Sequence, residues 1–92
     1  MIVSFRHKGL KRFYEEDDPS KLPAEMIERI RDILTVLEHA TELSAVDRPT
    51  LRLHVLKGDL KGFHAVTVRA NWRIMFRFEG GNSRDVDFVD YH

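Results

Sequence analysis

The chain of 92 residues lacks cysteine altogether, has only three prolines and five glycines, and carries no net charge at pH 7. Without cysteine there can be neither a disulfide framework nor a thiolate metal site, which fits a reducing compartment. The sequence also has no apolar run long enough to span a bilayer and no recognisable signal peptide. We therefore expect a soluble, cytoplasmic protein without a membrane partner, rather than a membrane protein or a small disulfide-stabilised secreted domain.

The chain does contain enough apolar material for one core. Hydrophobic residues make up 42% of it, including one tryptophan, two tyrosines and six phenylalanines. A domain of this size buries only about two-thirds of its unfolded surface, so the chain can sustain one compact unit and no more. We expect a single domain over residues 1–92.

The first half of the sequence has the periodicity of helices. Apolar residues at helical spacing predict a short amphipathic helix over residues 8–16, preceded by a strand at residues 2–5. The sequence Asp-Asp-Pro-Ser at 17–20 should end this helix. A second helix is predicted to begin between residues 20 and 23 and to run to about His39. Its continuous apolar stripe consists of Met26, Ile27, Ile30, Ile33, Leu34 and Leu37.

After residue 50 the apolar period changes to two, which is the pattern of half-buried strands. The predicted strands are residues 51–55, 66–69 and 72–78 and a last strand that ends at Tyr91, with turns at 57–62, 70–71 and 79–82. Two N-terminal helices followed by an antiparallel meander predict an α+β fold, in which both helices pack on one face of a small sheet.

Alternation along the strands predicts which side chains face away from the helices. If Trp72 packs against the helices as a core anchor, Arg73 must project from the opposite face, because successive strand residues switch sides. The same reasoning collects basic and titratable side chains on that face: Arg52, His54, Arg69, Arg73, Arg77 and the terminal Asp90-Tyr91-His92, with Lys57 at the rim. We expect Arg52 and Arg77 to keep the sheet soluble rather than to take part in chemistry.

The neutral total charge conceals one cationic segment. Residues 52–77 contain six arginines and lysines and a single acid, a net charge of +5, whereas acids gather at 15–18 and 79–90. A neutral protein with one basic segment favours a local phosphate-binding surface over nonspecific polycation behaviour.

Several motifs of the second half resemble one protein family. They are Leu56-Lys57-Gly58-Asp59, Gly62, Val68-Arg69, Asn71-Trp72-Arg73-Ile74 and the terminal Asp90-Tyr91-His92. Together they resemble the HigB-type toxins of bacterial toxin–antitoxin modules, also called plasmid-maintenance killer proteins, of the RelE-like superfamily. The resemblance spans residues 2–92.

This resemblance implies a RelE-like microbial RNase fold and a ribosome-dependent endoribonuclease that cuts mRNA in the A site and inhibits translation. The implied partners are a helix-turn-helix antitoxin of the HigA type, the bacterial ribosome and mRNA. Operator DNA would be contacted only through the antitoxin.

Metal-independent RNA cleavage requires activation of a 2′-hydroxyl, stabilisation of a phosphorane and protonation of the departing 5′-oxygen. Imidazoles suit both proton transfers because their pKa lies near neutrality, so His54 and His92 are candidates. Asp90 could act as the base or orient an imidazole. The sequence leaves the assignment of acid and base open.

The remaining candidates would bind the RNA. Arg73 is the preferred phosphorane stabiliser, because its planar fork of donors matches phosphate oxygens. Tyr91 could donate a hydrogen bond or stack on a base. Lys57 and Arg69 would position the flanking backbone.

Two other functions stay open. One is a ParE-like toxin, which inhibits DNA gyrase without catalysis; the other is a simple RNA-binding module. ParE-like toxins lack a comparable cluster of His, Tyr and Arg, so the cluster favours the nuclease. No pair of histidines has the spacing of a zinc site, and we expect no metal or other cofactor.

Overall fold

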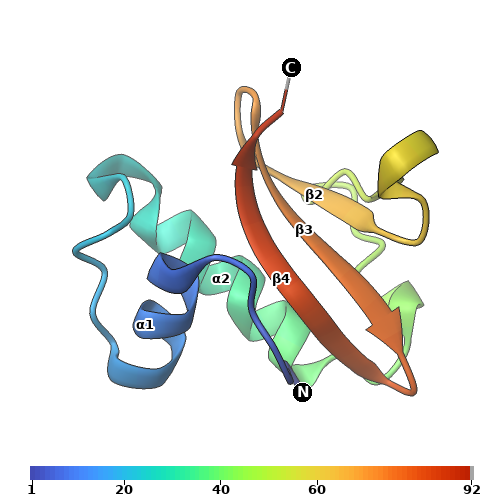
Figure 1. Cartoon of the computed structure of the whole chain (residues 1–92), viewed down its shortest axis with the longest axis horizontal. Coiled ribbons are helices and arrows are strands. Elements are labelled where there is room, and N and C mark those ends of the chain that lie inside the picture. The colour runs from blue at the N-terminus through green and yellow to red at the C-terminus, as the bar shows by residue number, and fades with distance from the viewer. Residues whose placement is uncertain (92) are drawn as a thin grey trace.

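The computed structural model describes residues 1–91, in which two α-helices cover one face of a four-stranded antiparallel sheet (Figure 1). The strand order β1-β2-β3-β4 is also the order along the chain, so the sheet is a meander. This is the α+β arrangement that the sequence predicts. We call the sheet face away from the helices the open face.

The first helix forms where its apolar spacing predicts it. α1 spans Lys8–Glu16, and its first turn is capped by His7, whose Nδ1 accepts a hydrogen bond from the backbone N–H of Leu10 at 3.1 Å. The helix ends at Asp17, which has a left-handed φ of 54°. Such a residue satisfies the last carbonyls of a helix while turning the chain away.

The second helix begins later than its apolar pattern predicts. α2 spans Ile27–His39 and is preceded by a single 3-10 turn, η1 (Ala24–Met26). Two further 3-10 turns, η2 (Leu43–Ala45) and η3 (Gly58–Leu60), lie in the loops before and after β1. Within residues 1–91, no helix is both long and apolar enough to cross a membrane.

The last three strands agree with the prediction. The strands are β1 (His54–Val55), β2 (His64–Arg69), β3 (Trp72–Glu79) and β4 (Asn82–Asp90). β3 and β4 are joined by Gly80 and Gly81, with φ values of 57° and 78°. Positive φ at both central residues is the two-residue hairpin turn whose twist matches that of the strands, and glycine adopts it without strain.

Two predicted strands are wrong in whole or in part. Residues 2–5 make only isolated bridges to β4, from Ile2 to Ser83 and from Phe5 to Val86. Of the predicted strand 51–55 only the last two residues pair with β2. Arg52 has a φ of 51°, which interrupts an extended chain. The alternation that predicted Arg52 on the same face as His54 therefore does not hold.

The main core lies between the helices and the sheet. Fully buried side chains of the helices, including Leu10, Ile30 and Ile33, pack against Ile74 and Phe76 of β3. Burial of one such side chain stabilises a fold by about 1.5–3 kcal/mol, so this layer supplies most of the driving force for folding.

Trp72 is a core anchor, as expected. Its ring stacks on that of Phe88 of β4 with centroids 4.6 Å apart and planes 17° from parallel. Because Trp72 faces the helices, its neighbour Arg73 faces the other way.

A second, smaller apolar cluster lies on the open face. Its buried members are Leu56, Phe63, Ala65 and Met75, with Leu60 and Val89 packed against them. The open face is therefore not uniformly polar. It has an apolar floor around which charged side chains are arranged.

Candidate functional site

The sheet register places the open-face side chains in cross-strand rows, because directly paired residues of antiparallel strands lie on the same face. Thr67, Arg73 and Val89 form one row. The adjacent row consists of His54, Ala65, Met75 and Asp87. Arg73 and His54 therefore project from the same face, as the sequence predicts.

Arg73 is held by the hairpin turn that precedes it. Its Nη1 donates to the carbonyl oxygens of Ala70 and, at 3.2 Å, of Trp72. The side chain is half-buried. Because both bonds use Nη1, the pair of donors on Nε and Nη2 is not needed to fix the side chain and is suited to bidentate phosphate binding.

Tyr91 lies at the same end of the sheet. Its backbone N–H donates to the carbonyl of Asn71 at 2.8 Å, which continues the β3–β4 ladder to the β2–β3 turn. Figure 1 shows the end of β4 beside this turn. The side chain is 44% exposed, and alternation from Val89 directs it to the open face. Arg73 and Tyr91 therefore converge at one corner of the sheet.

Asp90 does not lie on the same face as Arg73 and Tyr91, contrary to the expectation. It pairs with Trp72 in the β3–β4 ladder, so the alternation assigns it to the side opposite Arg73 and Tyr91. Its side chain is exposed at the last pair of the ladder. His92, the third member of the predicted terminal group, lies outside the described residues.

Arg69 also departs from the simple alternation. The register between β2 and β3 shifts between Thr67 and Arg69, so Arg69 pairs with Trp72 rather than joining the row of Arg73. A bulge inserts one extra residue into a strand and reverses the facing of the residues after it. Arg69 therefore lies beside the corner formed by Arg73 and Tyr91, and not in the same row.

The remaining predicted residues lie near the edge of the sheet. His54 is exposed on β1, two strands from β3, a separation of roughly 10 Å across the sheet. Lys57 follows β1 at the start of η3 and is exposed. It occupies the rim of the open face, as predicted.

Asp87 is an acid on the open face that the sequence reasoning missed. Asp87 is half-buried in the row of Met75, and its Oδ1 accepts a hydrogen bond from the backbone N–H of Phe88 at 2.9 Å. The alternation in β4 contains the signal, since Asp87 has the same parity as Val89. Within residues 1–91, no group of three or more His, Asp or Glu side chains could together hold a metal ion.

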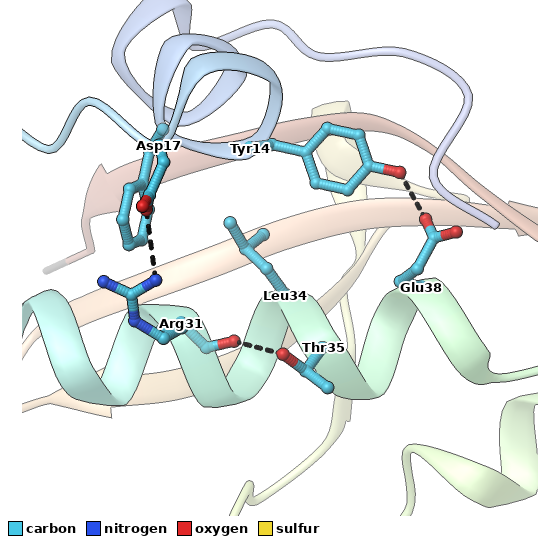
Figure 2. A pocket seen from close by; sticks show the side chains of 7 residues that line it. Tyr14, Asp17, Arg31, Leu34, Thr35 and Glu38 are labelled. Carbon is cyan, nitrogen blue, oxygen red and sulfur yellow. Dashed lines mark hydrogen bonds and ion pairs between the residues drawn. The ribbon is translucent and has the colours of Figure 1, made fainter.

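A groove of about 280 Å³ lies on the other side of the molecule, between α1 and α2 (Figure 2). Across it, the Tyr14 hydroxyl donates to the Glu38 carboxylate, and Arg31 pairs with Asp17 at 3.2 Å. The Tyr14–Glu38 bond, with some burial, raises the pKa of Tyr14 to about 12 and lowers that of Glu38. These contacts join two helices, and none of the predicted site residues within 1–91 lines the groove.

Comparison with known proteins yields one family. A family model described as RelE-like toxin of type II toxin–antitoxin system HigB matches residues 3–92. The chain is 46% identical over 92 residues to a protein of Proteus vulgaris named Endoribonuclease HigB, and the alignment covers all of both chains. It is 31% identical over 96 residues to Toxin HigB-1 of Vibrio cholerae, covering 100% of this chain and 98% of the relative.

A solved structure shares the fold. The YoeB/ParE toxin from Agrobacterium tumefaciens superposes with a TM-score of 0.65 at 19% identity, covering 100% of this chain and 99% of the other. The likeness confirms the RelE-like fold that the sequence predicts.

Proposed function

The chain belongs to the HigB-like toxins, RelE-like toxins of type II toxin–antitoxin systems, and from this premise we propose that it is a ribosome-dependent endoribonuclease that cleaves mRNA in the A site and inhibits translation. Membership of a type II system implies an antitoxin partner. The proposal adds that this antitoxin is a helix-turn-helix protein, that operator DNA is reached only through it, and that the toxin acts in the bacterial cytoplasm.

One observation of the structure carries the proposal. Arg73 is fixed by backbone carbonyls at the corner of the sheet where the backbone of Tyr91 is also fixed. A cation held in advance, at a corner of the sheet that also carries a tyrosine, suits a site where negative charge develops on a phosphate. The relative named as an endoribonuclease matches this chain over its whole length, which supports the same reading.

In the proposed reaction a ribose 2′-oxygen attacks the adjacent phosphorus while a base removes its proton. The bond from phosphorus to the 5′-oxygen then breaks, and an acid protonates the departing oxygen, leaving a cyclic phosphate and a 5′-hydroxyl. Arg73 stabilises the phosphorane and Tyr91 stacks on a base or donates a hydrogen bond. His54 and His92 serve the two proton transfers, one as the base that takes the 2′ proton and the other as the acid that protonates the 5′-oxygen.

The other predicted residues take supporting roles in this proposal. Asp90 acts as the base or orients an imidazole. Lys57 binds a phosphate at the rim of the open face. Arg69 binds a phosphate as well, and because it pairs with Trp72 rather than lying in the row of Arg73, the RNA backbone must bend around the β2–β3 turn to reach both arginines.

The test is cleavage of a defined mRNA on purified ribosomes, with the 3′ ends analysed for cyclic phosphate. We expect Arg73→Ala to lower the rate by roughly 10²–10³-fold, the usual loss for one preorganised donor. Deletion of His92 should cost roughly 10²–10⁴-fold, the size of an acid–base contribution. Lys61→Ala, which removes an exposed cation of the loop beside Lys57, is the control and should leave the rate unchanged.

Three outcomes would contradict the proposal. Equal losses in all three variants would indicate nonspecific electrostatics. Inhibition of purified DNA gyrase without RNA cleavage would establish the ParE-like function. Binding to RNA without cleavage on ribosomes would establish the simple RNA-binding module.

A further inference from the structure

Two arginines from opposite ends of the chain meet over one aromatic ring on the open face. The guanidinium carbon of Arg77, from β3, lies 4.5 Å from the ring centroid of Phe63, and that of Arg6 lies 5.4 Å from it. Arg6 belongs to the extended segment beside β4, where its backbone N–H donates to Val86 at 2.8 Å. The ring of Phe63 is 5% exposed, so the two side chains meet above a buried floor.

This convergence is not explained by charge neutralisation. Among residues 1–91, Asp85 is the one carboxylate that forms an ion pair with these arginines, with Oδ2 3.6 Å from Nε of Arg77, so the cluster of Arg6, Arg77 and Asp85 keeps a net positive charge. Bringing like charges together costs free energy, and each contact with the ring returns only about 0.5–1 kcal/mol at an exposed site. An anion bound between the guanidiniums would remove this cost.

The geometry leaves both guanidiniums able to bind such an anion. The contact with the ring of Phe63 uses none of the N–H donors of a guanidinium, and of these donors only Nε of Arg77 is paired, with Oδ2 of Asp85, among the ion pairs of residues 1–91. Arg6 is exposed and the side chain of Arg77 is 39% exposed. Gly62 lies beside this cluster: its φ of 94° favours glycine, and a Cβ there would lie 3.0 Å from Nη1 at the end of the Arg77 side chain.

We propose that Arg6 and Arg77, both placed over the ring of Phe63, form a second phosphate-binding subsite that holds the RNA backbone away from the cleaved linkage. The inference rests on the proposed nuclease function and adds a substrate contact to it. Arg77 lies four residues from Arg73 along β3 and on the same face, a separation of roughly 13 Å. A single strand of RNA lying along β3 would therefore contact both arginines.

This proposal gives Arg77 a role beyond the expected one of keeping the sheet soluble. Solubility requires an exposed charge and nothing more. It does not require the same ring to be shared with Arg6.

The experiment compares Arg6→Gln, Arg77→Gln and the double variant with the unchanged protein. The matched control is Arg12→Gln on α1, which also removes one exposed guanidinium and one ion pair, to Asp18 at 2.8 Å. KM and kcat for mRNA cleavage on ribosomes are measured between 50 and 200 mM salt. Melting temperatures verify that each variant folds, and the corresponding lysine variants keep the charge without the planar fork.

The subsite predicts a specific pattern. The double variant should raise KM several-fold with kcat unchanged, and the slope of log affinity against log salt should become shallower by roughly 0.7, the value for one lost phosphate contact with a single strand. The lysine variants should recover most of the slope. If the double variant matches Arg12→Gln in KM and slope, the subsite is refuted. Cleavage by the unchanged protein would in that case still support the proposed function.

Two further arms identify the source of the phosphate. If the double variant loses affinity for ribosomes that carry no mRNA, the phosphate belongs to ribosomal RNA. If it loses affinity only for ribosomes that carry an mRNA with 2′-deoxyribose at the cleaved position, the phosphate belongs to the message. If the unchanged protein fails to cleave at all, binding of a single-stranded RNA oligonucleotide still decides: equal affinities of the double variant and Arg12→Gln refute the subsite.

Discussion

Arg73 is held by backbone carbonyls, whereas several other arginines of the chain are held by carboxylates. Arg12, Arg31, Arg77 and Arg84 lie within 2.8–3.6 Å of an Asp or Glu oxygen. A carbonyl fixes a guanidinium without neutralising it, so Arg73 keeps its full charge. A side chain intended for a developing phosphorane benefits from this arrangement, since any nearby carboxylate would weaken its attraction for the phosphate.

Asp87 opposes RNA binding in the proposed arrangement. It lies in the row of Met75, between the positions of Arg73 and Arg77 on β3. We expect Asp87→Asn to lower KM roughly threefold at low salt with kcat unchanged, because one like charge at ~7 Å in water costs about 0.6 kcal/mol. Initial rates at two salt concentrations measure the effect, which should shrink as salt screens it. A fall in kcat with KM unchanged would instead place Asp87 in the chemistry.

At the scale of single residues, alternation alone predicted most facings and failed where a strand is irregular. It placed His54, Arg73 and Trp72 correctly. It failed at Arg69 because a bulge inserts a residue that no local pattern announces. It failed at Asp90 because a residue adjacent in sequence to Tyr91 cannot share its face in a regular strand.

At the scale of elements, Arg29 joins α2 to the strand that carries the site. Its guanidinium donates to the carbonyls of Thr67 at 2.9 Å and of Val68 at 3.3 Å, and also to that of Thr50. The carbonyls of Thr67 and Val68 lie where β2 extends beyond the two residues of β1. Arg29 therefore replaces the missing part of a neighbouring strand and holds the bulged end of β2.

Replacement of Arg29 should loosen that end of the sheet. We expect Arg29→Gln to lower the free energy of unfolding by about 2 kcal/mol, within the range for hydrogen bonds from a charged donor. Amide hydrogen exchange at residues 68–70 should accelerate more than elsewhere. The matched control is Arg31→Gln on the same helix, whose exposed ion pairs should contribute less than about 1 kcal/mol. Equal effects of the two substitutions would refute the role of Arg29.

The elements that the sequence predicted well are those with local signals. α1 and the β3–β4 hairpin follow from apolar spacing and from two adjacent glycines. The predicted strand at 51–55 failed because Leu51 is buried at the end of a turn, where the backbone N–H donates to Arg48 at 2.9 Å. A buried leucine has the same sequence signature in a turn as in a strand, and only tertiary contacts distinguish the two.

At the scale of the whole molecule, the two sides of the sheet have different tasks. The helix side contains the main core and the groove between α1 and α2, whereas the open face carries Arg73, His54 and the cluster over Phe63. Substitutions on the helix side should therefore affect stability first, and those on the open face should affect RNA cleavage first.

The acid stability of the molecule depends on Glu38, which joins three segments. Its carboxylate accepts hydrogen bonds from the Tyr14 hydroxyl and, at 3.0 Å, from the backbone N–H of Ile2, and these bonds lower its pKa below the ordinary 4.5. A lowered carboxyl pKa stabilises the fold above pH 4.5, and this contribution is lost as the pH falls through the folded-state value. Burial also lowers the pKa of His64, so stability should begin to decline as the pH falls below 6.5.

Tyr14→Phe isolates the part of the acid stability that is due to the hydrogen bond between Tyr14 and Glu38. At pH 7 we expect it to destabilise the protein by about 1 kcal/mol, at the low end for a bond to a charged group because Tyr14 is 38% exposed. In urea unfolding at pH 3.5 the difference from the unchanged protein should shrink. Because the pKa of Tyr14 is raised to about 12, the difference should also shrink as the pH rises from 10 to 12. An equal difference at every pH would exclude the linkage.

The brevity of β1 has a consequence for self-association. A bare strand edge offers carbonyls and N–H groups to any passing chain and is a common starting point for polymerisation. Along the outer edge of β2, the Thr67 carbonyl is already occupied by Arg29 and its N–H by the carbonyl of Leu51 at 2.8 Å. An incoming strand would find both backbone groups of Thr67 already bonded, so this position of the β2 edge does not offer a starting point for pairing with another copy of the chain.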